Sequence, residues 1–107
     1  MATETREING MDLADLRGKC DAARRDPSSA QRRPRVVAEW IGGDQSRVTS
    51  GDNVLDVNTP GTLGPMRLLL ASLASCEVDV IATHASLLGL KIESLSVDAE
   101  GHFDVRS

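Results

Sequence analysis

The feature that most constrains the fold is a long apolar segment at residues 64–89, which reads GPMRLLLASLASCEVDVIATHASLLG. Pro65 suits the first turn of a helix, where its missing N–H costs no hydrogen bond. Gly89 can adopt the left-handed conformation that commonly ends one. Between them, apolar side chains recur at helical spacing, at Leu69, Leu73, Cys76, Val80 and Leu87. The segment predicts one central core helix, packed on several sides, with Cys76 near its middle.

A membrane span is the alternative interpretation of this segment. Glu77, Asp79 and His84 interrupt it, well short of the roughly 20 apolar residues that a transmembrane helix needs. We therefore expect the helix to belong to a soluble protein. The chain has two cysteines and no apolar signal segment at its N-terminus, which favours the cytoplasm and reduced thiols.

Length, charge and residue spacing limit the partners and bound groups that we expect for this chain. The chain has 107 residues, which predicts one domain with a modest core. Its formal net charge of −4 does not indicate a nucleic acid or an anionic membrane as partner. His84 and His102 have no neighbours at metal-ligand spacing, so no metal site is expected. Gly42-Gly43 does not open a helix as a phosphate-binding loop would, and no cofactor is expected.

The first third of the chain predicts a single helix. Residues 1–7 are polar and expected to be disordered. Asn9-Gly10 predicts a turn, after which Asp12 can cap a helix that runs to about Arg25. One face of this helix carries Leu13, Leu16, Cys20 and Ala23.

From Arg35 the apolar pattern changes to a period of two. It predicts a three-stranded meander with turns at Gly42-Gly43-Asp44 and Gly51-Asp52-Asn53, and with strands at residues 35–41, 47–50 and 54–57. After the long helix, residues 92–100 alternate again and predict a further strand. Its inward-facing residues would be Leu95, Val97 and Ala99.

This order of elements predicts an α+β fold. We divide it into residues 1–34, which form an N-terminal tail, helix and connector, and residues 35–107, which form the main domain. The last residues still alternate, and one long helix on four strands leaves a helix face uncovered. We therefore expect either that the chain continues beyond Ser107 or that a partner completes the core.

Cys76 has the most distinctive chemistry in the chain, yet its own helix offers little to activate it. A cysteine attacks as the thiolate, which a nearby positive charge or a helix N-terminus stabilises. Arg67 lies nine positions earlier, roughly 13 Å along the helix axis, too far to touch the sulfur. The adjacent Glu77 and Asp79 are negative and disfavour a thiolate. The residues alone favour a structural cysteine over a catalytic one.

Several motifs nevertheless resemble a known family when they are read in order. Cys76 follows Pro65 by eleven positions in the run GPMRLLLASLASC, and the helix exit reads LLGLKIESLSVDAEGHFDVR. Before them come Asn9-Gly10, Asp26-Pro27 and Trp40-Ile41-Gly42-Gly43. Together these motifs resemble the OsmC/Ohr family of thiol-dependent hydroperoxide reductases. The match is to the longer branch with an extra N-terminal helix, covers about residues 8 to 106, and corresponds to the first half of such a protein.

The resemblance implies an OsmC-like intertwined homodimer, in which each half carries a long cysteine-bearing helix packed on a β-sheet. It implies oxidative stress defence by reduction of organic hydroperoxides, or hydrogen peroxide, at Cys76. A lipoyl or other dithiol partner then restores the thiol. The family's second cysteine would lie beyond Ser107, and Cys20 is in the wrong segment to replace it.

The resemblance also implies two residues that orient the reacting groups. The family's arginine from the first hairpin falls on Asp44, and Arg47 is the nearest substitute. Its glutamate near the proline falls on Met66 or Arg67. The candidate catalytic residues are therefore Cys76 and Arg47. The alternative is a catalytically degenerate OsmC-like binding or structural dimer, in which Cys76 is only a core residue.

Overall fold

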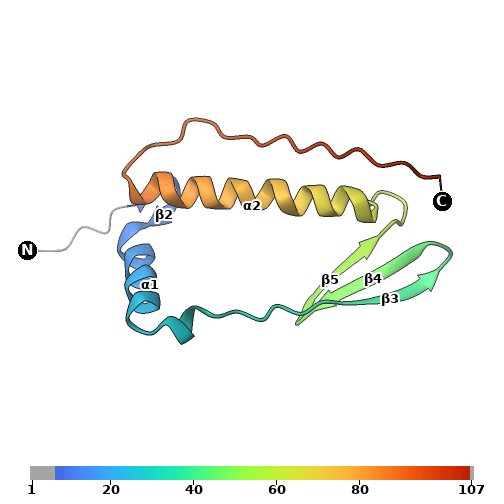
Figure 1. The fold of residues 1–107 in the computed structure, drawn as a ribbon, viewed down its shortest axis with the longest axis horizontal. Coiled ribbons are helices and arrows are strands. Elements are labelled where there is room, and N and C mark those ends of the chain that lie inside the picture. Colours follow the sequence, from blue (N-terminus) through green and yellow to red (C-terminus); the bar gives the residue numbers. More distant parts are fainter. Residues whose placement is uncertain (1–6, 107) are drawn as a thin grey trace, which may run out of the picture. The chain divides into compact units, whose positions relative to one another are not determined.

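The computed structural model describes residues 7–106, and within them it has the α+β composition that the sequence predicts (Figure 1). These residues contain two α-helices, one short 3-10 helix and two antiparallel sheets. They gather into two compact units. Unit 1 holds the residues up to Arg32 together with Ser75–Asp98, and unit 2 holds Arg33–Ala74 together with the residues from Ala99 onward.

Unit 1 begins with a small hairpin. Strands β1 (Glu7–Ile8) and β2 (Met11–Asp12) pair antiparallel across the expected turn at Asn9-Gly10. Both turn residues have positive φ, 53° and 76°, a conformation that Asn and Gly tolerate best. Two residues per strand are too few to show alternation, so the sequence predicted the turn and not the strands. The disorder expected for residues 1–7 otherwise lies outside the described residues.

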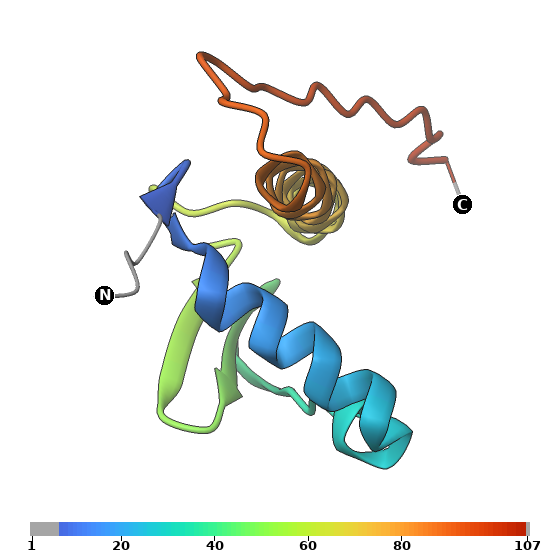
Figure 2. The same ribbon diagram turned by 90° about the vertical axis from the view of Figure 1, so that its left-hand side faces the viewer.

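Helix α1 (Leu13–Arg25), which Figure 2 shows from the side, confirms the predicted helix. Asp12 caps it, its Oδ1 accepting a hydrogen bond from the backbone N–H of Asp15 at 3.1 Å. The 3-10 helix η1 (Pro27–Ala30) follows it directly. The predicted face is also confirmed, because the less exposed residues include Leu13, Leu16, Cys20 and Ala23.

The meander of unit 2 is confirmed, with strand ends that differ from the prediction by at most two residues. Strands β3 (Val37–Gly42), β4 (Gln45–Ser50) and β5 (Asn53–Val57) form one antiparallel sheet in the order β3-β4-β5. The register shifts between Trp40 and Gly42, where the Trp40 indole N–H donates to the Gly43 carbonyl at 2.8 Å. Val57 is the buried apolar residue of this unit.

Helix α2 (Pro65–Leu87) confirms the helix predicted from the apolar segment. Pro65 is its first residue, and Gly89, with a φ of 75°, follows its end. The prediction that this helix is packed on several sides is wrong for the single chain. Leu69 and Leu73 are 53% and 55% exposed. Because the helix is apolar nearly all round, its pattern does not reveal which face its own chain covers.

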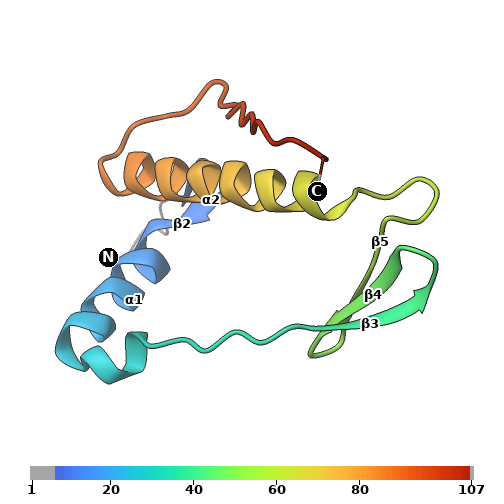
Figure 3. The ribbon, with the colours of Figure 1, turned by 45° about the vertical axis from the view of Figure 1, so that its right-hand side comes forward.

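The predicted strand at residues 92–100 is wrong. The chain after α2 is extended, but in the described part it has neither helix nor strand (Figure 3). The expected alternation is present in the burial, since Leu95, Val97 and Ala99 are half-buried while the residues between them are exposed. A strand also needs a neighbouring backbone for its ladder of hydrogen bonds. No described segment pairs with this one.

Candidate functional site

Cys76 lies exposed near the middle of α2. Leu73 and Val80, at positions i−3 and i+4, share its face of the helix, and Leu69 lies one turn further back. All three neighbours are about half exposed, at 55%, 47% and 53%. We call Leu69, Leu73, Cys76 and Val80 the cysteine stripe. The thiol therefore lies exposed on an apolar face of its own helix.

The charged side chains next to Cys76 on its own helix are acidic. Glu77 is adjacent, and Asp79 accepts a long hydrogen bond from the Thr83 hydroxyl at 3.4 Å. His84, two turns further on, has its Nδ1 2.9 Å from the Val80 carbonyl oxygen. Within the described residues, the thiol itself makes neither a hydrogen bond nor an ion pair. A cation that stabilises its thiolate must therefore come from another element.

Arg47, the candidate for that cation, lies on β4 and is paired with Asp56 on β5. Its Nε donates to Asp56 Oδ1 at 2.8 Å and its Nη2 to Oδ2 at 3.3 Å. These hydrogen bonds hold the pKa of the Asp56 carboxyl below its ordinary value and raise that of the Arg47 guanidinium. Two of the five guanidinium N–H groups are used, which leaves donors on Nη1 for another acceptor.

Sequence reasoning missed Asp56, although the signal was present. The two-residue turn Gly51-Asp52 pairs Ser50 with Asn53. Three residues before Ser50 on β4 lies Arg47, and three residues after Asn53 on β5 lies Asp56. The antiparallel register therefore places these two residues opposite each other. Opposite charges directly across an antiparallel pair are expected to interact.

The two candidate catalytic residues belong to different units. Arg47 is in unit 2, and Cys76 is in the part of α2 that belongs to unit 1. Each is described within its own unit, so their catalytic pairing stays a prediction. Arg67, in the first turn of α2, lines an open hollow of about 610 Å³ together with Met66 and Phe103.

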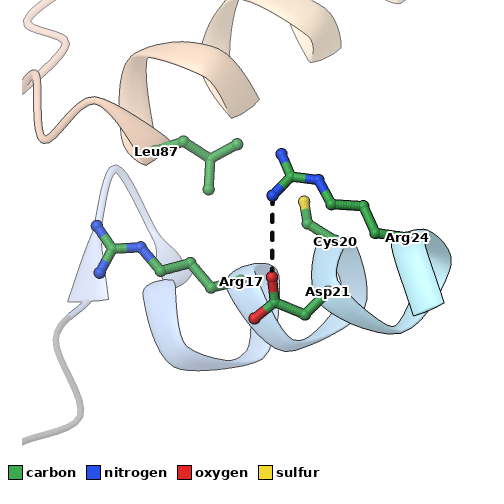
Figure 4. A pocket seen from close by; sticks show the side chains of 5 residues that line it. All are labelled: Arg17, Cys20, Asp21, Arg24 and Leu87. Carbon is green, nitrogen blue, oxygen red and sulfur yellow. Dashed lines mark ion pairs between the residues drawn. The ribbon is translucent and has the colours of Figure 1, made fainter.

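The second cysteine lies in a shallow pocket of about 310 Å³ within unit 1 (Figure 4). Cys20 shares this pocket with three charged residues of α1 and with Leu87 at the end of α2. Arg24 is paired with Asp21 at 4.0 Å. Arg17 completes the lining.

Cys20 is not placed to form a disulfide with Cys76 of the same chain. Both thiols are free. Cys20 and Leu87 line the same pocket, and Leu87 follows Cys76 by eleven residues, about 16 Å along the helix axis. A disulfide needs Cα atoms within about 7 Å of each other. The expectation that Cys20 does not replace the second cysteine of the family therefore has geometric support.

Comparison with known proteins adds no family assignment. A scan against protein-family models finds no match, and a search of the curated proteins finds none either. The OsmC/Ohr resemblance thus rests on the order and spacing of the motifs in this chain, and it stays a prediction.

Helix α2 also satisfies a simple test for a membrane span. It has 23 residues and contains an 18-residue window with a mean hydropathy of 1.4, so it is long and apolar enough by length and composition alone. Core helices of soluble proteins share these properties, so this finding does not distinguish a core helix from a membrane span. The expected cytoplasmic location stays a prediction.

Proposed function

We propose that this chain is an OsmC-like thiol peroxidase that reduces organic hydroperoxides through Cys76. The observation that carries the proposal is the exposed thiol in the middle of an apolar helix face, between Leu73 and Val80. An organic hydroperoxide combines an apolar body with a reactive O–O bond. The cysteine stripe offers a surface for the first and a nucleophile for the second.

The proposed reaction begins with attack of the Cys76 thiolate on the terminal oxygen of the hydroperoxide. A sulfur–oxygen bond forms, the O–O bond breaks, and the leaving alkoxide takes a proton to become an alcohol. Cys76 is oxidised to a sulfenic acid. A dithiol reductant then returns it to the thiol, forming a disulfide of its own and releasing water.

Arg47 is the proposed cation in this reaction. A guanidinium beside the sulfur favours the thiolate over the thiol. Asp56 holds Arg47 by two hydrogen bonds, which orients the side chain while leaving Nη1 available. Arg67 could act on Cys76 only from a second copy, because on its own helix it lies about 13 Å away along the axis.

We propose that the protein acts as a homodimer in which a second copy covers the cysteine stripe. Support comes from the exposure of Leu69 and Leu73 in the first half of a 23-residue helix. Exposed apolar side chains that gather on one face often mark a protein–protein interface. Covering it would enclose the thiol in an apolar pocket and exclude water from the reacting atoms.

One observation favours the alternative, a binding or structural dimer without peroxidase chemistry. Glu77 and Asp79 are the charges beside Cys76 on its helix, and in the described residues no cation is bonded to the thiol. In this alternative Cys76 only packs as a core residue of the dimer. The two functions differ in how readily the thiol ionises.

The pH dependence of Cys76 alkylation separates the two functions. The experiment uses Cys20→Ser as background, so that one thiol reacts. If the chain is a peroxidase, alkylation of Cys76 should be half-maximal below about pH 6.5, within the range of activated cysteines. In Arg47→Ala this midpoint should move up toward the value for a free cysteine. A midpoint at or above about 8.5, the value for a free cysteine, would contradict the peroxidase.

A further inference from the structure

One side-chain amide joins the N-terminal hairpin to the end of α2. Asn9 Nδ2 donates to the Ser86 hydroxyl oxygen at 3.0 Å and to the Leu90 carbonyl at 2.9 Å. Asn9 Oδ1 accepts from the backbone N–H of Ile92 at 2.8 Å. Ser86 is fully buried, and its hydroxyl donates to the Ala82 carbonyl at 2.7 Å. We call these three hydrogen bonds of Asn9 the Asn9 latch.

The residue that follows makes this amide chemically labile. Gly10 has no side chain to hinder its backbone nitrogen, nothing lies within 4 Å of the place that a Cβ would take, and the residue is exposed. When that nitrogen attacks Asn9 Cγ, a C–N bond closes a five-membered succinimide ring and the side-chain nitrogen leaves as ammonia. Water then opens the ring to aspartate or isoaspartate. The sum is hydrolysis of an amide, so neither oxidant nor reductant is needed.

We propose that Asn9-Gly10 is a deamidation site whose modification opens the Asn9 latch. The product carries a carboxylate, which has no N–H to donate to Leu90 or Ser86. One of its oxygens would then face the Leu90 carbonyl oxygen, now without a donor between them. Isoaspartate also lengthens the backbone by one carbon within a tight turn. Modification therefore frees the start of the extended segment from the hairpin.

The same three hydrogen bonds protect Asn9 from modification. The Asn9 side chain must leave its partners before Cγ can meet the Gly10 nitrogen in the ring-closing geometry. Reaction thus proceeds from a locally open state, whose population is set by the stability of the latch. Loosening of this end of unit 1 exposes the site, and the resulting modification makes the loosening permanent.

The first test compares deamidation of the full chain in native buffer and in concentrated urea at the same mildly alkaline pH. Peptide mass spectrometry follows the conversion of Asn9 to acid, with Asn53 and Asn58, which Gly does not follow, as internal controls. We expect Asn9 to react at least about tenfold more slowly in the native chain, which corresponds to about 1.4 kcal/mol of protection. Equal native and unfolded rates would overturn the proposal.

The second test asks whether the modified amide opens the latch. Asn9→Asp mimics the product, and Asn53→Asp adds the same charge at the exposed first residue of β5 in unit 2. Hydrogen exchange at the Ile92 amide should become faster in Asn9→Asp and stay unchanged in Asn53→Asp. Below about pH 4 the introduced carboxyl is protonated and can donate again, so protection should partly return. Unchanged protection at Ile92 in Asn9→Asp would refute the latch.

Discussion

Arg47 and Asp56 face each other across strands β4 and β5 and are joined by two hydrogen bonds, of 2.8 and 3.3 Å. Their side chains are 53% and 35% exposed, so water screens the pair. The contact holds the guanidinium by its Nε edge and one terminal nitrogen. It thereby limits the orientations in which Arg47 can meet any other acceptor.

This pair predicts a specific dependence of stability on pH. The pKa of Asp56 is lowered in the folded chain from its ordinary value of 3.8. Its contribution is therefore complete above pH 3.8 and is lost as the pH falls through the lowered folded value. Urea unfolding should show a smaller loss of stability on acidification in Asp56→Asn than in the parent chain. The control is Asp52→Asn, in the exposed turn. Identical acid profiles for Asp56→Asn and the parent would contradict this expectation.

The cysteine stripe predicts how Leu73 contributes to assembly. If a second copy covers the stripe, Leu73→Ala removes a buried side chain from the interface, a change of about 2–5 kcal/mol in a covered site. The dissociation constant of the dimer, measured by light scattering or sedimentation, should then rise by more than about tenfold. Leu88→Ala, exposed beyond the end of α2, is the matched control. A parent chain that stays monomeric at micromolar concentration would refute the dimer.

The cap of α1 predicts a local loss of stability. Asp12→Ala removes the acceptor for the Asp15 N–H and should lower the free energy of unfolding by about 1 kcal/mol. Asp12→Asn keeps a side-chain oxygen in place and should stay close to the parent. Thermal unfolding followed by circular dichroism measures both. Equal losses in the two variants would show that the cap hydrogen bond is not the cause.

Local rules were enough to predict the elements whose ends are set by single residues. Pro65 and Gly89 delimit α2, Asp12 opens α1, and glycine turns separate the three strands of unit 2. These features depend on backbone conformation and on hydrogen bonds within a few residues. No distant contact is required to form them.

Contacts between distant residues are where the sequence was least informative. Alternation at Leu95 and Val97 predicted a strand, but a strand also needs a partner, and the pattern of one segment does not supply it. The Asn9 latch joins residues about 80 positions apart in the sequence. The neighbouring residues therefore predicted its turn but not its hydrogen bonds. Likewise, the apolar pattern of α2 predicted a helix without showing that Leu73 is uncovered in the single chain.

The most direct test of the central claim is whether Cys76 reduces an organic hydroperoxide. Pre-reduced protein with Cys20→Ser is mixed with cumene hydroperoxide, and Cys76→Ser in the same background is the control. Peroxidase chemistry predicts one equivalent of alcohol per chain, with Cys76 trapped as a sulfenic acid in mass spectrometry and turnover when a dithiol is added. Consumption no greater than in the Cys76→Ser control would contradict the account.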